Sequence, residues 1–97
     1  MSSPHTVEYR PEVLAEDFPV IPRNLQSRII RAVEARLMTE PSRYGLRLRR
    51  SLAGLWKLRV GDYRLVYEMH GARITVWAVR HRKEAYDEAE KRWRTGV

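Results

Sequence analysis

The alternation of hydrophobic and polar residues in the middle of the chain predicts a β-hairpin. In LWKLRVGDYRLVYEM, strand-like runs at 55–60 and 63–69 flank a short Gly-Asp turn that sets Arg59 opposite Arg64. Directly opposed residues share a face of a sheet, and the faces alternate along each strand. One face is then entirely apolar or aromatic, and we predict that it forms the core. Its members are Trp56, Leu58, Val60, Tyr63, Leu65, Tyr67 and Met69.

Five further elements follow from the same kind of pattern. Residues 5–9 alternate as a short strand, residues 11–18 form a short helix, and residues 24–38 carry apolar side chains at helical spacing. Residues 73–80 predict a third strand of the meander, and residues 82–93 a last helix. We therefore expect an α+β fold. It has a small antiparallel-dominated sheet (N-terminal strand plus three-stranded meander), two N-terminal helices and a C-terminal helix, packed on one face of the sheet.

The turn near residues 70–72 joins the hairpin to the third strand. It sets Glu68 opposite Arg73 as an exposed ion pair, and Arg64 opposite Trp77 within cation–π reach. Strict alternation then divides the third strand between the two faces. Ile74, Val76 and Ala78 join the core face, and Thr75, Trp77, Val79 and His81 join the other face.

The second face of the hairpin concentrates positive charge. Its centre holds Lys57, Arg59 and Arg64 and no carboxylate, although like charges on neighbouring strands destabilise a sheet. One interpretation is a solvated face, on which long side-chain stems cover apolar surface. The other is an anion site, because arginine donates bidentate hydrogen bonds to phosphate and lysine acts as a point charge. We favour the anion site, with Trp77 and His81 beside the cations.

Charge and composition agree with a polyanionic partner. The 97 residues carry a net charge of +7, and we expect them to form one domain, 1–97. The loop 42–54 adds a basic run in which Arg49 and its neighbours either contact phosphate or are simply solvated. The chain has no cysteine, which excludes disulfide and thiolate chemistry, and it has no run long enough to span a membrane. We expect a cytoplasmic protein with no membrane partner.

The residues offer little conventional catalytic machinery. The three histidines, His5, His70 and His81, have no metal-ligand spacing, and there is no Gly-rich phosphate loop or Ser-His-Asp arrangement. We therefore expect no metal and no cofactor. A nuclease built here would use the 2′-OH of RNA as the nucleophile. The protein would position the strand, stabilise negative charge and move protons.

The stretch LAGLWKLRVGDYRLVYEM, followed by a strand and then VRHRKEAYDEA, resembles the RelE/ParE superfamily of toxins. The resemblance is close over residues 45–90. It implies a compact sheet with helices on one side and a cognate antitoxin that wraps the toxin. For the RelE branch it implies metal-free cleavage of mRNA in the ribosomal A site. The ParE branch shares the fold but poisons DNA gyrase.

The resemblance also implies roles for individual residues. Lys57 matches a lysine that stabilises the transition state or takes part in proton transfer. Arg64 matches the arginine that holds the scissile phosphate, and Arg59 on the neighbouring strand is expected to bind phosphate. Tyr86 matches a tyrosine that stacks on the substrate; the alternative is that Tyr86 only anchors the last helix.

A further arginine of the family site falls within RHR. Its spacing from the tyrosine favours Arg80, the local HR pattern favours Arg82, and strict alternation points His81 into the site instead. A second lysine of the RelE pattern is replaced here by Leu55. We predict a RelE-like toxin that acts as a ribosome-dependent endoribonuclease. The alternatives are a ParE-like gyrase poison and a non-catalytic nucleic-acid-binding relative.

Overall fold

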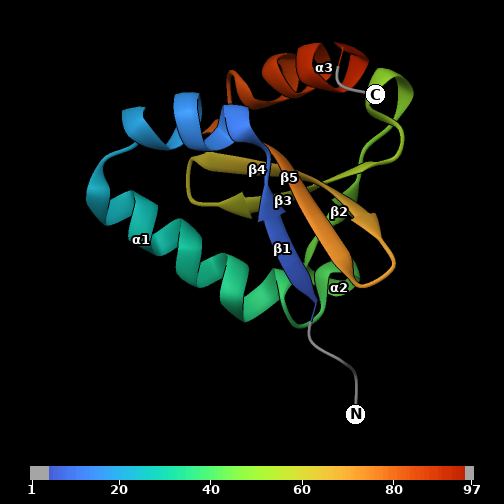
Figure 1. The fold of residues 1–97 in the computed structure, drawn as a ribbon, viewed down its shortest axis with the longest axis horizontal. Coiled ribbons are helices and arrows are strands. Elements are labelled where there is room, and N and C mark those ends of the chain that lie inside the picture. The colour runs from blue at the N-terminus through green and yellow to red at the C-terminus, as the bar shows by residue number, and fades with distance from the viewer. Residues whose placement is uncertain (1–4, 96–97) are drawn as a thin grey trace.

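A computed structural model describes residues 5–95, and a five-stranded mixed sheet lies at its centre (Figure 1). The strand order is β1-β5-β4-β3-β2; β1 runs parallel to β5 and the other neighbours are antiparallel. The predicted strand, hairpin and meander are confirmed, and the short β2 is an addition from within the predicted loop. The strands are β1 (Thr6–Tyr9), β2 (Leu46–Arg47), β3 (Leu55–Val60), β4 (Tyr63–His70) and β5 (Arg73–His81).

The helices also lie close to where the apolar spacing placed them. The predicted helix 24–38 is α1 (Arg23–Ala32), which continues directly into η3 (Val33–Leu37). The remaining helical segments are η1 (Val13–Asp17), η2 (Phe18–Val20), α2 (Pro41–Tyr44), η4 (Arg50–Leu52) and α3 (Ala85–Thr95). Within the described residues, none of these helices combines the length and the hydropathy that crossing a bilayer requires.

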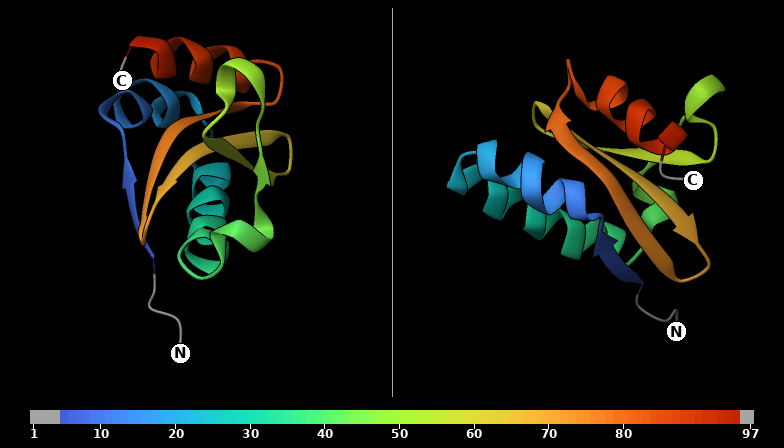
Figure 2. Two further views of the ribbon diagram at one scale, coloured as in Figure 1. Left: turned by 90° about the vertical axis from the view of Figure 1, so that its right-hand side faces the viewer. Right: turned by 45° about the horizontal axis from the view of Figure 1, so that its top comes forward.

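The helices cover both faces of the sheet, so the expectation that they pack on one face was wrong. Figure 2 shows α1 and α3 on opposite sides of the strands. The face that hairpin alternation assigned to the core packs against α1 and η3. The other face, expected to be open, packs against α3. An amphipathic helix such as α3 needs an apolar surface but does not itself specify which face of a sheet supplies it.

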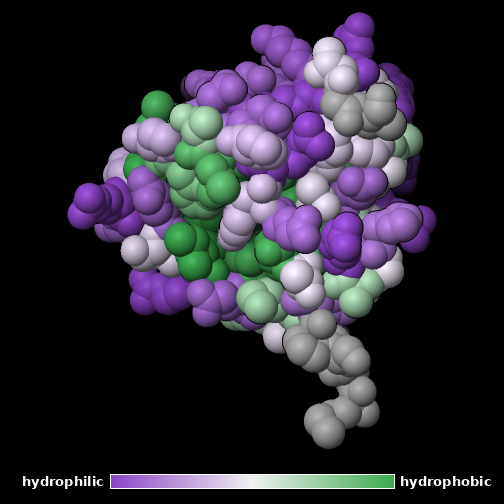
Figure 3. All heavy atoms as spheres, in the orientation of Figure 1, coloured by the Kyte–Doolittle hydropathy of each residue, from purple (hydrophilic) through white to green (hydrophobic). Residues whose placement is uncertain are grey.

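Two separate hydrophobic clusters result. The first cluster lies between the sheet and α1, and its buried members include Ile29, Val33, Leu58, Leu65 and Tyr67. The second cluster lies under α3 and contains Leu55, Val66, Trp77, Ala78 and Ala89. On the side drawn in Figure 3, hydrophobic residues gather between the N-terminal helices, whereas hydrophilic residues dominate over α3. Arg59 and Arg64, at the end of this face near the β3–β4 turn, lie outside the second cluster.

The β3–β4 register agrees with the prediction, with Arg59 opposite Arg64. The β4–β5 register does not, because it shifts between Val66 and Tyr67. Val66 pairs with Ala78 and Tyr67 pairs with Val76, so Trp77 is the extra residue of a β-bulge. Beyond the bulge the two faces exchange, which places Ala78 in the second cluster and Val79 in the first. The assignments of Ala78 and Val79 from strict alternation were therefore wrong.

The turn into β5 lies one residue later in the chain than the expected ion pair required. His70 pairs with Arg73, and Glu68 pairs with Thr75, so Glu68 does not face Arg73. The Glu68 carboxylate instead accepts a hydrogen bond of 3.2 Å from Trp77 Nε1. The predicted partner contacts were wrong because the two-residue turn is Gly71-Ala72, with a φ of +63° at Gly71, and is not centred on His70-Gly71.

Candidate active site

A cationic pocket occupies the uncovered end of the second sheet face. Its volume is about 220 Å³, and its lining residues are Tyr44, Leu46, Lys57, Arg59 and Arg64. The three cations come from β3 and β4, where the Gly61-Asp62 turn and the period-two alternation put them on one face. Among residues 5–95 no carboxylate lines the pocket, so no acidic neighbour there balances the repulsion among the three cations.

Lys57, which lines this pocket, also contacts Tyr86 of α3, which does not line it. The Lys57 Nζ lies 5.6 Å from the centroid of the Tyr86 ring, over its face. Tyr86 stands in the first turn of α3, is half-buried and packs against the second hydrophobic cluster. Its ring therefore anchors the helix and also borders the cations, so the two roles considered for Tyr86 are compatible.

Arg64 is held beside the β3–β4 turn. Its Nη1 donates hydrogen bonds of 3.0 Å to the carbonyl oxygens of Gly61 and of Tyr63. The side chain is only half-buried, and its other guanidinium nitrogens have no protein partner among residues 5–95. Arg59 opposite is exposed. The two guanidinium groups are thus available to an anion that enters from solvent.

Arg80 is the ladder partner of Arg64 but is already neutralised. Its Nε donates to Asp17 Oδ1 at 2.6 Å, and its Nη1 lies 3.6 Å from Glu84 and 3.9 Å from Glu88. The hydrogen bond with the Asp17 carboxylate raises the pKa of Arg80. Of the three residues in RHR, Arg80 shares the sheet face of Arg64. Its guanidinium group, however, is paired with carboxylates and not with the cationic pocket.

Asp17 connects this arginine to the last helix. The carboxylate is fully buried; it accepts two hydrogen bonds of 2.8 Å from the Arg92 guanidinium and one of 2.9 Å from the Val79 N–H. Burial alone would raise the pKa of the Asp17 carboxyl, but the hydrogen bonds from Arg92, Val79 and Arg80 outweigh it and lower that pKa. The network ties η1, β5 and α3 together.

His81 and Arg82 lie outside the cationic pocket. His81 pairs with Tyr63 on the face of the first cluster, with ring centroids 6.0 Å apart. The bulge at Trp77 reversed its side, so the placement of His81 in the site by strict alternation was wrong. Arg82 follows the strand and is exposed; its backbone N–H donates to Asp62 O at 2.8 Å.

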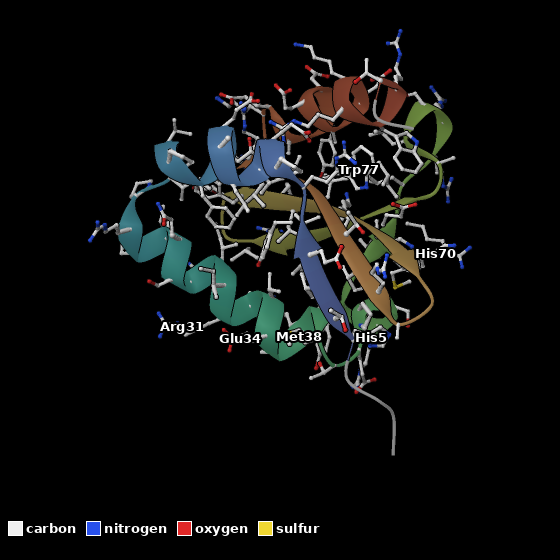
Figure 4. The ribbon with its side chains drawn as sticks, in the orientation of Figure 1. His5, Arg31, Glu34, Met38, His70 and Trp77 are labelled. Carbon is white, nitrogen blue, oxygen red and sulfur yellow. The ribbon has the colours of Figure 1, made fainter. Side chains whose placement is uncertain are left out.

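Trp77 and Arg49 are also absent from the pocket. Trp77 is only 3% exposed, and Figure 4 shows it between the sheet and α3. Its ring packs edge-on against Trp93 and carries the Arg10 guanidinium at 4.0 Å, so the predicted contact with Arg64 was wrong. A buried ring cannot stack on a base. Arg49 is exposed just before η4 and does not line the pocket.

Three residues of the site region were missed from the sequence. Tyr44 and Leu46 are 46% and 63% exposed, which is unusual for large apolar side chains beside three cations. Leu46 lies opposite Lys57 through the two-residue β2, which is too short to show an alternating pattern. Asp17 had a weak signal, because it follows the buried Val13 at helical spacing and therefore faces inward.

Metal ligands do not cluster in the part of the chain that the structure describes. Residues 5–95 contain no group of three or more His, Cys, Asp or Glu side chains placed to hold an ion. The chemistry that the pocket itself offers is cation-based. Guanidinium and ammonium groups bind a phosphodiester and stabilise added negative charge, and the exposed part of an aromatic ring can contact a base.

Comparisons with known proteins identify relatives over most of the chain. The family model for the ParE toxin of the type II toxin-antitoxin system, parDE, matches residues 7–86. Toxin RelG of Mycobacterium tuberculosis (strain ATCC 25618 / H37Rv) is 33% identical over 85 residues. That alignment covers 86% of this chain and 97% of the relative. The pocket residues Lys57, Arg59 and Arg64 and the helix residue Tyr86 all lie within the range of the family model.

Solved structures give the same result. A chain of the toxin-antitoxin complex RelBE2 from M. tuberculosis superposes with a TM-score of 0.77 at 29% identity, covering 84% of this chain and 94% of that chain. The RelB-RelE antitoxin-toxin complex from Methanococcus jannaschii matches with a TM-score of 0.60 at 22% identity. It covers 81% of this chain and 94% of that chain, and at this identity it supports the fold alone.

Proposed function

This chain belongs to the RelE/ParE superfamily of toxins of type II toxin–antitoxin systems, and on that premise we propose that it is a ribosome-dependent endoribonuclease restrained by a cognate antitoxin. The observation that carries the proposal is a pocket lined by three cations, one of which also contacts the Tyr86 ring. Lys57, Arg59 and Arg64 supply positive charge without a lining carboxylate, and the Lys57 ammonium lies over the Tyr86 ring.

The reaction that suits such a pocket is an internal transesterification of RNA. The 2′-oxygen of one nucleotide loses its proton and attacks the adjacent phosphorus, while the bond to the 5′-oxygen of the next nucleotide breaks. The products are a 2′,3′-cyclic phosphate and a 5′-hydroxyl, which takes up a proton. Arg59 and Arg64 would bind the non-bridging phosphate oxygens, where negative charge increases in the transition state.

Lys57 and Tyr86 have complementary roles in this proposal. The Lys57 ammonium would stabilise the same developing charge or pass a proton, and the Tyr86 ring would contact a base and fix the strand. A pocket without a strong general base leaves much of the rate to alignment of the 2′-oxygen with the phosphorus. We therefore assign the ribosome the role of presenting a bent messenger in its A site, and we assign Arg80 a positioning role.

A second candidate function is that of a ParE-like gyrase poison. It is favoured by the family model itself, which describes ParE toxins, and by Leu55, which replaces the second lysine of the RelE pattern. Leu55 is 1% exposed and belongs to the second hydrophobic cluster, so its side chain packs under α3. For such a gyrase poison, the cationic pocket would bind a macromolecular target and would not cleave RNA.

Cleavage of a defined messenger on the ribosome separates these functions. Programmed ribosomes would carry an unmodified messenger or one with a single 2′-O-methyl group at the scissile nucleotide of the A-site codon. We expect cleavage of the unmodified messenger, with a cyclic phosphate or 3′-phosphate end, and no cleavage at the methylated position. Cleavage at the methylated position would contradict the mechanism.

A supercoiling assay with DNA gyrase completes the comparison. We expect no inhibition by amounts of protein that cleave the messenger fully. Gyrase inhibition in the absence of any messenger cleavage would assign the chain to the ParE-like function. The cognate antitoxin, expected to be an acidic or amphipathic protein, should suppress whichever activity is found, and co-expression with the toxin measures that suppression as restored growth.

A further inference from the structure

An arginine groove lies next to the cationic pocket, on the other side of Arg59. It has a volume of about 540 Å³ and runs between the α1–η3 helix and the β3–β4 turn. Arg28 leans on that turn, since a Cβ added at Gly61 would lie 3.4 Å from its Nη1. The residues that define the groove are Arg28, Arg31, Arg36 and Arg59, around a floor that includes Ala32 and Ala35.

Among residues 5–95, the four guanidinium groups of the groove have no acidic partner, because none of them forms an ion pair with a carboxylate. Their side-chain contacts are weak hydrogen bonds to carbonyl oxygens and a cation–π contact of Arg36 with Tyr44 at 6.0 Å. Arg31 Nε lies 3.4 Å from Ser27 O, and Arg36 Nη1 lies 3.5 Å from Arg59 O. Arg31 extends outward from α1 in Figure 4. Such crowding of like charges favours an anionic occupant.

The lining of the groove indicates which anion fits. Proteins that bind single-stranded nucleic acid offer aromatic rings on which bases stack, and no aromatic side chain lines this groove. Its floor is apolar and shallow, because Ala32 and Ala35 are small and lie about one turn apart on the helix. A polypeptide with small apolar side chains toward the floor and carboxylates toward the rim satisfies both features.

We propose that the arginine groove binds an acidic, amphipathic segment of a protein partner. The apolar side chains of that segment cover Ala32 and Ala35, and its carboxylates pair with Arg28, Arg31 and Arg36. Arg59 lines both the groove and the cationic pocket, so an occupant that reaches Arg59 removes one phosphate ligand from the pocket. This regulatory consequence rests on the proposed function; the binding itself does not.

Binding can be tested on the isolated full chain by NMR. The probe is a short synthetic peptide in which glutamate alternates with alanine and leucine at helical spacing; a glutamine version and an oligouridylate of equal formal charge are the comparisons. We expect the glutamate peptide to shift resonances of α1, η3 and the β3–β4 turn, with affinity that falls as salt increases. The glutamine peptide should leave them unchanged, and the oligouridylate should shift Lys57 and Arg64 instead.

A charge-matched pair of variants makes the test specific. Arg28→Glu/Arg31→Glu should weaken binding of the glutamate peptide about tenfold, the loss expected from two exposed ion pairs. Arg23→Glu/Lys91→Glu changes the net charge equally at exposed sites outside the groove and should retain the affinity. Circular dichroism melting checks that both variants are folded.

Three results would overturn the proposal. The first is an equal loss of affinity for the glutamate peptide in both double variants. The second is that the oligouridylate, but not the peptide, shifts the NMR resonances of the groove residues. The third is that no probe shifts these resonances. The first result would show that peptide affinity depends only on the net charge of the protein. The second would identify the groove as a nucleic-acid-binding surface. A chain that binds the peptide in the groove but cleaves no messenger would refute the proposed function and leave the groove assignment standing.

Discussion

Asp17 and Arg80 are joined by a hydrogen bond of 2.6 Å between a fully buried carboxylate and a guanidinium group from the last strand. The same carboxylate binds Arg92 of α3 at two points, so one side chain connects the N-terminal turns, the sheet and the helix that carries Tyr86. Any change at Asp17 therefore reaches the cationic pocket through the position of α3.

Asp17→Asn should destabilise the fold strongly. The substitution removes the charge of the buried carboxylate that binds the Arg92 guanidinium, which is 7% exposed, and leaves only the more exposed Glu88 and Glu16 beside it. Removal of one partner of a buried pair costs about 3–5 kcal/mol. Urea denaturation measures the free energy of unfolding. Glu16→Gln is the matched control, since Glu16 is exposed and lies 3.9 Å from Arg92; we expect a change within about 0.5 kcal/mol. Similar losses in both variants would argue against a special role for Asp17.

The Asp17 network should make stability depend on acid pH. The folded state lowers the pKa of Asp17, so the unfolded chain binds a proton at a higher pH than the folded chain does. The free energy contributed by the ionised carboxylate is complete above the unfolded pKa of about 3.9 and is lost as the pH falls through the folded value. Unfolding free energies from about pH 5 downward should therefore fall more steeply for the wild type than for Asp17→Asn. Parallel curves would show that Asp17 does not titrate as proposed.

Arg64→Ala should abolish messenger cleavage and relieve growth arrest while leaving the protein folded. The side chain is only half-buried and its hydrogen bonds go to carbonyl oxygens of its own turn, so we expect a stability loss of about 1 kcal/mol. Arg73→Ala is the control; it removes an exposed arginine from the far end of the same sheet. Growth, cleavage and thermal melting are the measurements. Full toxicity in a folded Arg64→Ala protein would refute the site assignment.

Tyr86 offers a comparison between the ring and the hydroxyl group. Tyr86→Phe keeps the ring over Lys57 and should retain both the fold and most of the cleavage rate. Tyr86→Ala should slow cleavage about ten- to a hundredfold through lost stacking, and it should also lower the melting temperature because the ring packs under α3. A Tyr86→Phe protein as inactive as Tyr86→Ala would show that the hydroxyl group, and not stacking, is what the reaction needs.

Gly45→Ala should be among the more destabilising exchanges outside the site. A Cβ at Gly45 would lie 1.8 Å from the hydroxyl oxygen of Tyr67, which is fully buried and donates a hydrogen bond of 2.8 Å to Pro41 O. Overpacking of this kind costs about 1–3 kcal/mol. Adding Tyr67→Phe removes the clashing oxygen and should recover part of the loss, measured by thermal melting of the single and double variants. Additive losses would contradict the steric explanation.

The sequence alone determined the hairpin and its charged face. Period-two alternation around the Gly-Asp turn is a local property, and a slip of one residue would have put Lys57, Arg59 and Arg64 among apolar neighbours. The helix predicted at 24–38 followed from apolar spacing for the same reason and matches α1 with η3, whereas α3 begins at Ala85 and not at residue 82 as predicted. Local patterns of this kind need no knowledge of what packs against them.

Only the tertiary structure decided which face α3 covers and where β5 bulges. The β5 sequence is apolar on both sides because each face of the sheet has its own core, so alternation could not reveal Trp77 as the extra residue or predict the reversal at His81. The neutralisation of Arg80 depends on Asp17, which lies 63 residues away in the chain. A contact between residues so far apart is set by the packing of whole elements, which no local pattern records.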